Sequence, residues 1–234
     1  MFSLESFHRQ YETDTADLMI RDRRFRFFVP KSLDGFVDQG DVFKDFPLWA
    51  KIWEASIVLA DHLAAMPVDP ERRFLEIGCG VGVVGIVAAA FGHRITITEY
   101  NSDALDFARA NVHANLSGED AAAIEVARLD WTRPQLDGRF DFVVGSEVIY
   151  KETDFQAILK LFETCLRPSG EIILAEGVRK TSLEFFRQVS HRFHITARKR
   201  TLRSKGKEVR VILAEMRFRR GLSGGGAVAS PPGP

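Results

Sequence analysis

The feature that most constrains the fold is the stretch 74–82, in which apolar residues lead directly into three alternating glycines. A run of small apolar residues, 83–90, follows it. This order is typical of a buried parallel strand that turns sharply into a helix. Gly78, Gly80 and Gly82 lack a Cβ, so the backbone can turn tightly and a ligand can approach it closely. The next helix begins with backbone N–H groups that have no partner in the helix. The stretch therefore predicts a nucleotide-type cofactor site.

The composition is that of an ordinary soluble globular chain. The 234 residues are 45% hydrophobic and 27% charged, which suits one domain with one substantial core. The formal net charge is zero, so charge alone indicates no class of partner. Two cysteines make no disulfide framework, the first residues lack an export signal, and no apolar run is long enough to cross a bilayer. We expect a cytoplasmic monomer that does not enter membranes.

The last part of the chain has an uneven charge distribution. Residues 192–220 contain eleven basic side chains opposed only by Glu208 and Glu215, an excess of nine positive charges. A basic surface of this kind can meet an acidic protein or a nucleic acid. The simpler interpretation is the solvated outer face of a β-hairpin. We favour the hairpin, and a nucleic-acid partner is the less favoured alternative.

Strand and helix patterns alternate along most of the chain. The expected strands are 73–77, 94–98, 123–129, 140–145 and 171–176. The first expected helix begins near Trp49, and the others are 82–91, 102–115, 153–166 and 180–188. Two final strands, 193–200 and 208–218, are joined by a short turn and must pair antiparallel. The order predicts an α/β fold with a doubly wound, mostly parallel seven-stranded sheet and an antiparallel C-terminal hairpin. Residues 17–30 predict a small β-hairpin ahead of this sheet.

Two cofactors compete for the glycine loop. Gly80, Gly82 and Gly85 have the spacing of the dinucleotide fingerprint, and Glu99 follows where a ribose-binding acid belongs. Glu76, two residues before the first glycine, instead suits S-adenosylmethionine. A carboxylate there would repel a pyrophosphate, whereas S-adenosylmethionine carries an ammonium and a sulfonium. Charge therefore favours S-adenosylmethionine.

The remaining cofactor contacts are expected at the ends of the strands, because ligands of open α/β sheets bind outside the strands' carboxyl ends. We expect Glu99 to accept hydrogen bonds from the ribose hydroxyls. Asp130 and Trp131 would hold the adenine amino group and the adenine face. Tyr100 is a candidate for the adenine as well, and is equally well explained as a partly exposed aromatic residue. We interpret Cys79 as a small residue that fills space in the loop and not as a nucleophile.

Three segments outside the glycine loop resemble the methyltransferase-like protein lysine methyltransferases of methyltransferase family 16. They are the helix-like segment 51–60 with Trp53, the segment 129–131, and the segment 146–155, which begins Ser-Glu-Val-Ile-Tyr. The likeness covers about residues 51–218. It implies a class I, Rossmann-like methyltransferase that uses S-adenosylmethionine and takes a protein lysine as substrate. Many members have Asp where this chain has Glu147, so the substrate carries over less securely than the cofactor.

The resemblance also implies roles for residues near the transferred methyl group. Trp53 would close over the methionine part of the cofactor, and Ser146 would contact the cofactor at the end of the fourth strand. Glu147 and Tyr150 are the candidate catalytic residues. A lysine must lose its proton before it accepts a methyl group, and a nearby carboxylate favours the charged amine instead. We therefore expect Glu147 to capture and orient the lysine and Tyr150 to shape its channel.

The resemblance divides the chain into three segments. Residues 1–48 would be an N-terminal extension of the same domain and residues 49–220 the methyltransferase domain. Residues 221–234 form a tail rich in Gly, Ser and Pro that cannot bury apolar surface, and we expect it to be disordered.

Two other functions stay open at this point. A small-molecule N- or O-methyltransferase would share the cofactor half of the site. A non-catalytic RNA-binding adaptor would use the basic C-terminal hairpin, although the intact Glu76, glycine loop and Glu99 argue against a degenerate site. The six histidines show no metal-ligand spacing, so no metal site is expected.

Overall fold

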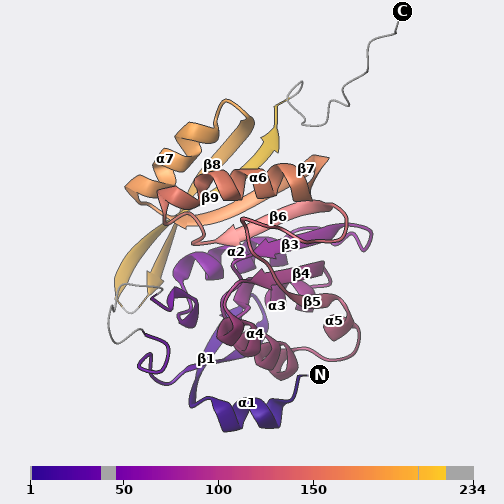
Figure 1. Ribbon diagram of the computed structural model, residues 1–234, viewed down its shortest axis with the longest axis vertical. Helices are drawn as coiled ribbons and strands as arrows, with labels where there is room; N and C mark the ends of the chain where they lie inside the picture. The colour runs from indigo at the N-terminus through magenta and orange to yellow at the C-terminus, as the bar shows by residue number, and fades with distance from the viewer. Residues whose placement is uncertain (1, 38–45, 205, 220–234) are drawn as a thin grey trace, which may run out of the picture.

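The protein is built around a central seven-stranded sheet (Figure 1). The computed structural model describes residues 2–37, 46–204 and 206–219. In spatial order the strands are β5 (Ile124–Arg128), β4 (Arg94–Glu99), β3 (Arg73–Ile77), β6 (Phe140–Ser146), β7 (Leu166–Gly177), β9 (Lys207–Phe218) and β8 (Phe193–Ser204). The first five are parallel, and β9 runs antiparallel to both of its neighbours. The predicted fold class is confirmed.

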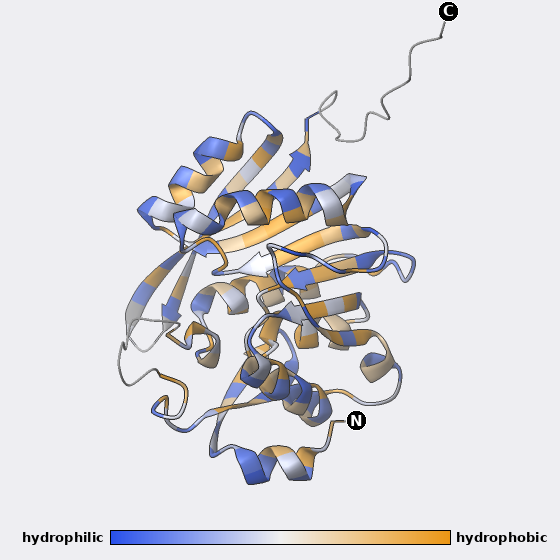
Figure 2. Ribbon diagram, viewed as in Figure 1, coloured by the Kyte–Doolittle hydropathy of each residue, from blue (hydrophilic) through white to orange (hydrophobic). Residues whose placement is uncertain are grey.

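Helices cover both faces of this sheet, as its apolar strands require. The helices are α2 (Glu54–Ala64), α3 (Val83–Ala90), α4 (Ser102–Asn115), α5 (Gly118–Ala122), α6 (Phe155–Cys165) and α7 (Lys180–Val189). Successive residues of a strand point to opposite faces. Accordingly, Phe74 of β3 packs in one core cluster with α2, α3 and α4, while Leu75 packs in the other with α6 and α7. The central strands are hydrophobic along most of their length (Figure 2).

The N-terminal segment packs against the first of these clusters. It consists of α1 (Leu4–Gln10) and the antiparallel pair β1 (Thr13–Ile20) and β2 (Arg23–Pro30), which confirms the predicted hairpin. The fully buried Asn111 of α4 exchanges hydrogen bonds with the backbone of Phe28 and also donates to the carbonyl of Val81. One amide side chain thus ties the hairpin to the glycine loop.

The predicted start of the first helix, near Trp49, is wrong. Residues Leu48–Ala50 form one 3-10 turn, and α2 begins only at Glu54. Trp53 has an extended backbone and its indole N–H donates to the carbonyl of Leu48 at 2.9 Å. This side-chain contact holds an extended link ahead of the helix.

Other boundaries shift less. The helix predicted for 153–166 begins at Phe155, after a 3-10 turn at Glu152–Asp154, and β7 begins at Leu166, five residues ahead of the predicted strand. α4 has the predicted bounds Ser102–Asn115, and the short helix α5, which starts at Gly118, was not predicted. No helix in the described part of the chain is long and apolar enough to span a membrane. The predicted tail, 221–234, lies outside the described residues.

The close approach of α3 to the sheet generates the first prediction. A Cβ on Gly85 would lie 2.0 Å from Cγ2 of Ile97 in β4 and 2.8 Å from Oε2 of Glu76. We expect Gly85→Ala to lower the free energy of unfolding by about 1–3 kcal/mol or more, because the core must be overpacked to accept the methyl group. Urea unfolding measures this. Gly35→Ala is the matched control, since a Cβ there meets nothing within 4 Å, and equal effects of the two changes would contradict the packing argument.

Candidate active site

A cavity of about 920 Å³ opens at the carboxyl ends of β3, β4 and β6. Eleven of the predicted site residues line it: Trp53, Gly78, Cys79, Gly80, Glu99, Tyr100, Asp130, Trp131, Ser146, Glu147 and Tyr150. Glu76 and Gly82 are not in its wall. The structure therefore brings together segments that lie up to a hundred residues apart in the sequence.

The glycine loop forms one wall of this cavity. Gly78, Gly80 and Gly82 all have positive φ angles, a conformation that residues with a Cβ rarely adopt. A Cβ on Gly80 would also lie 3.0 Å from the carbonyl oxygen of Trp49. Gly82 is the N-cap of α3 and lies behind the cavity wall. Cys79 lines the cavity, and burial raises the pKa of its thiol well above the ordinary value, which suits the predicted filler rather than a nucleophile.

The structure corrects the role predicted for Glu76. Its side chain is only 1% exposed, and its Oε2 accepts a hydrogen bond from the N–H of Gly85 at 2.9 Å. Burial raises the pKa of this carboxyl from 4.5 to about 8, so it is mostly protonated at neutral pH. Glu76 therefore supports the first turns of α3 from behind and does not line the cavity. The charge argument from the sequence assumed that this carboxyl faces the cavity, and the structure places it behind the wall instead.

Glu99, at the end of β4, faces the cavity instead. Its carboxylate accepts hydrogen bonds from the N–H groups of Gly80 at 3.1 Å, Tyr100 at 2.7 Å and Asn101 at 3.3 Å. Burial raises its pKa, and the three N–H groups act in the opposite direction. Glu99 thereby joins the end of β4 to the glycine loop of β3. Its position suits the predicted contact with a ribose.

The segment after β5 supplies the predicted adenine end. The indole of Trp131 lies against Gly78, where an added Cβ would be 3.3 Å from the ring. Asp130 accepts hydrogen bonds from the N–H and hydroxyl of Thr132, and these bonds hold the pKa of the carboxyl below its usual value. Tyr100 is 58% exposed and lies under the guanidinium of Arg128, 4.9 Å from the ring centroid.

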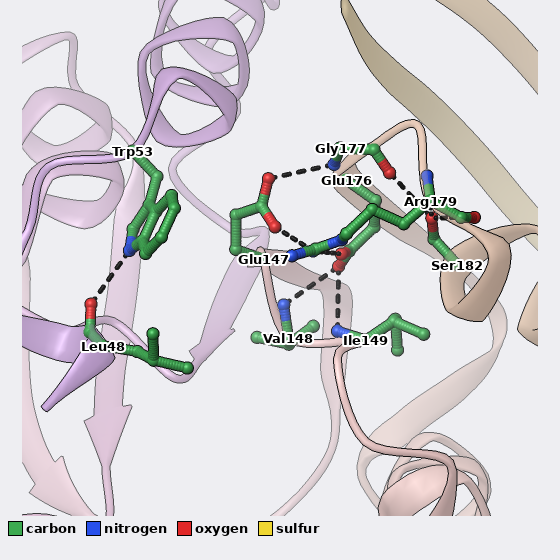
Figure 3. A network of polar contacts seen from close by, with 9 residues as sticks. All are labelled: Leu48, Trp53, Glu147, Val148, Ile149, Glu176, Gly177, Arg179 and Ser182. Atoms are coloured by element: carbon green, nitrogen blue, oxygen red, sulfur yellow. Dashed lines mark hydrogen bonds and ion pairs between the residues drawn. The ribbon is translucent and has the colours of Figure 1, made fainter. Parts of the chain in front are cut away.

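Glu147 belongs to a polar cluster that sequence reasoning did not predict in full (Figure 3). Its Oε1 accepts a hydrogen bond from the N–H of Gly177 at 2.9 Å, and its Oε2 pairs with Arg179. Arg179 also reaches Glu176, at 3.5 Å. Burial raises the pKa of Glu147, and the guanidinium of Arg179 opposes this shift.

The fully buried Glu176 supports the loop that follows β6. Its Oε1 accepts hydrogen bonds from the N–H groups of Val148 at 3.0 Å and Ile149 at 3.2 Å. Burial raises its pKa from 4.5 to about 8, with a further contribution from the charge of Glu147. Glu176 sits near the end of the fifth parallel strand, so the strand-end rule that selected Glu99 could have found it. Arg179 carried no such signal.

Aromatic side chains line the cavity beside Glu147. Trp53 lies across from Arg179, with Glu147 between them in Figure 3, and the ammonium of Lys51 lies 4.1 Å from its ring centroid. Tyr150 is 36% exposed and lines the same cavity. The volume, the glycine loop and Glu99 together fit a nucleoside cofactor with an adjoining acceptor channel.

Comparison with known proteins identifies the family to which this chain belongs. The sequence model of a family described as lysine methyltransferase matches residues 47–192, more than half of the chain. The chain belongs to the lysine methyltransferase family. The resemblance inferred from its motifs is thereby confirmed.

Curated relatives carry names that agree with this family. Protein N-lysine methyltransferase METTL21A of Danio rerio is 34% identical over 153 residues, which cover 62% of this chain and 69% of the relative. EEF1A lysine methyltransferase 3 of Mus musculus is 34% identical over 152 residues, covering 62% of this chain and 64% of the relative. METTL21A of Xenopus tropicalis is 28% identical over 183 residues, covering 77% of this chain and 83% of the relative.

Solved structures share the fold at lower identity. A predicted O-methyltransferase from Agrobacterium tumefaciens gives a TM-score of 0.54 at 20% identity, covering 68% of this chain and 80% of its own. Precorrin-6y C5,15-methyltransferase from Geobacter metallireducens gives a TM-score of 0.53 at 20% identity. The match covers 69% of this chain and 88% of that protein. These likenesses show the class I methyltransferase fold.

This member of the lysine methyltransferase family is thus an enzyme that uses S-adenosylmethionine, and its substrate is a lysine in a protein. A small-molecule acceptor is not favoured, because the curated relatives are named for protein lysine methylation. The same family assignment argues against a non-catalytic adaptor.

The position of Glu99 generates a prediction for cofactor binding. We expect Glu99→Gln to raise the Kd for S-adenosylmethionine roughly 10- to 100-fold, because a charged acceptor at the cavity wall is lost. Isothermal titration calorimetry measures this Kd. Glu119→Gln, in the exposed helix α5, should leave the Kd unchanged. Unaltered binding by the Glu99 variant would place the ribose elsewhere.

The burial of Glu76 generates a prediction about pH. The carboxyl titrates at about 8 in the folded chain and near 4.5 when unfolded, so the folded state holds an extra proton between these values. The contribution of Glu76 to the free energy of unfolding should therefore fall as pH rises from about 4.5 to about 8. Glu76→Gln cannot ionise, so its stability relative to the natural chain should increase with pH across that window. Urea unfolding at several pH values tests this, and a pH-independent difference would contradict it.

Proposed function

We propose that the methyl acceptor is a lysine side chain that a protein substrate inserts into the cavity beside Glu147. The observation that carries this proposal is the backbone of Glu147, which has a φ of 56°. A left-handed conformation is unfavourable for a residue with a Cβ. Such strain persists where the surroundings impose it and is concentrated at functional sites.

Three contacts hold Glu147 in this conformation. Its N–H donates to the carbonyl of Ala175 at 3.0 Å, its carboxylate accepts the N–H of Gly177, and Arg179 pairs with it. All three partners lie on β7 or directly after it. The carboxylate is therefore aimed by the neighbouring strand, and its place in the cavity wall suits the capture of an incoming ammonium.

The bound cofactor supplies a methyl group on a positively charged sulfur. To accept it, a lysine with a pKa of about 10.4 must first lose a proton, which costs about 4–5 kcal/mol at pH 7. Trp53 and Tyr150 line the cavity, and loss of water around a lysine inserted between them would disfavour its charged form and lower the cost. With S-adenosylmethionine bound, the nitrogen lone pair would form the new N–C bond as the S–C bond breaks, and the proton lost beforehand would have passed to solvent.

Arg179 resolves a conflict in the role of Glu147. A free carboxylate would stabilise the charged lysine and oppose its deprotonation. The guanidinium beside it offsets part of the negative charge. We infer that the pair orients the lysine through a hydrogen bond without holding its proton strongly, so that positioning is the main catalytic contribution.

Glu147→Gln tests this role, because it keeps the size of the side chain and removes its charge. We expect an unchanged Kd for S-adenosylmethionine and a loss of methyl transfer on the order of a hundredfold, the scale of a misplaced acceptor. Radiolabelled cofactor is incubated with a cell extract and each purified variant, and the labelled species are separated by size and analysed for methyllysine. Glu152→Gln is the matched control, an exposed acid five residues along.

The assay separates the alternatives. Label in a protein band as methyllysine supports the proposal, and label only in small molecules overturns it. Wild-type rates with Glu147→Gln would remove its assigned role while leaving the reaction intact. The name of the mouse relative specifies EEF1A as the substrate of that protein. For this chain we propose the chemical class alone, a lysine in a protein.

We also propose that the enzyme acts as a cytoplasmic monomer. In support, Cys79 and Cys165 are both free and buried, as suits a reducing compartment. Light scattering of the purified chain should give a mass near 26.3 kDa, and a doubled mass would reject the monomer.

A further inference from the structure

The ends of β8 and β9 project past the sheet at the edge where the active site lies. Pairing between β7 and β9 ends at Gly177 with Val211, but β8 and β9 remain paired as far as Ser204 with Lys207. Gly177 is the carboxyl end of β7, and its N–H binds the carboxylate of Glu147. The residue pairs of β8 and β9 that extend beyond β7, at the side of the sheet in Figure 1, therefore begin next to the proposed catalytic carboxylate.

We propose that this hairpin end, defined as residues 199–203 and 208–210, binds an acidic segment of the protein substrate. The proposal rests on the proposed function, since it names a property of the protein whose lysine enters the cavity. It gives a role to the basic surface that the catalytic site leaves unexplained.

The hairpin end carries an excess of unneutralised positive charge. Lys199, Arg200 and Arg210 are exposed, and none of them forms an ion pair with another described residue. Arg203 lies 3.7 Å from Glu208, and both of these side chains are largely exposed to water. A pair of that kind is worth little and is easily exchanged for a contact with a partner.

The sheet register places Lys199 and Arg210 close to the catalytic cluster, whereas Arg200, which pairs with Val211, lies on the opposite face. Lys199 and Glu176 both pair with Ile212, so they lie in one row on the same face, about 10 Å apart across two strand spacings. Arg210 is two residues beyond Ile212 on that face, and its carbonyl accepts the N–H of Val178. A cationic surface therefore begins one residue from Arg179.

This spacing sets where the acid should be in a substrate. An extended chain advances about 3.3 Å per residue, so the span of about 10 Å from Glu176 to Lys199 corresponds to roughly three residues. Glu147 follows β6, one strand spacing farther away, which extends the span to about five residues. We therefore expect Asp or Glu at about three to five residues from the methylated lysine.

The chemistry of the hairpin end favours a protein over a nucleic acid. Residues 195–212 contain no Phe, Tyr or Trp on which a base could stack. The whole chain has no net charge, unlike the strongly basic domains typical of nucleic-acid binding. Carboxylates of an acidic segment need only the exposed cations.

The test uses two labelled peptides with one central lysine. One carries Glu and the other Gln at about three to five residues on either side of it. Fluorescence anisotropy measures the Kd of each peptide for the full chain, with S-adenosylhomocysteine present so that no turnover occurs. The wild-type chain should bind the Glu peptide roughly five- to tenfold more tightly, and the difference should shrink with added salt.

Variants of equal charge change locate the effect. Lys199→Glu with Arg210→Glu should abolish or reverse the preference. Arg94→Glu with Lys160→Glu should retain it, because these exposed residues lie at the amino end of β4 and on α6, away from the hairpin end. All variants should keep the wild-type Kd for S-adenosylmethionine, which verifies their fold.

Three outcomes would overturn the proposal. They are equal affinity of the two peptides for the wild-type chain (including no measurable binding of either), an equal loss of preference in both double variants, and tighter binding of a single-stranded RNA through Lys199 and Arg210. Failure of the proposed function is distinguishable, because it appears as absence of methyllysine in the extract assay with the wild-type chain. The peptide preference is measured without any methyl transfer.

Discussion

The close contact of α3 with β3 and β4 is the constraint on which the cofactor site depends. Only a glycine fits at position 85, where an added Cβ would be 2.0 Å from Ile97. This contact brings the start of α3 down against the sheet, so that the glycine loop turns directly above the ends of β3 and β4. Glu99 can then span from β4 to the N–H of Gly80. The shape of the cavity follows from helix–sheet packing.

Two buried carboxyls support the two halves of the site in the same way. Glu76 binds the backbone of α3 behind the glycine loop, and Glu176 binds the backbone of the loop after β6. Burial raises the pKa of each to about 8. Each lies behind the cavity and acts on a segment that lines it. Acids at strand ends thus serve two purposes in this fold, since Glu99 and Glu147 face the cavity while Glu76 and Glu176 position its walls.

The antiparallel hairpin joins the proposed catalytic carboxylate to the proposed recognition surface. β9 pairs with β7, which holds Glu147 through Gly177 and the adjoining Arg179, and β8 and β9 then continue beyond the sheet. The strand that closes the sheet therefore also places a cationic surface beside the acceptor channel. In the proposed function the cofactor half of the cavity depends on β3, β4 and β5, and the substrate half depends on β6, β7 and the hairpin.

The sequence by itself determined the order of strands and helices, the glycine loop and the position of Glu99, because these depend on local periodicity and on strand ends. The cofactor followed from the resemblance of its motifs to a known family. It also located Glu147 and Tyr150 through a motif at a known place in the fold. Tertiary structure decided the direction of the Glu76 side chain, the extended link at Trp53 and the pairing of Glu147 with Arg179. Each of these depends on which face of an element is covered and by what. A carboxylate two residues before a glycine loop reads the same in sequence whether it faces a cofactor or the underside of a helix, and only packing distinguishes the two.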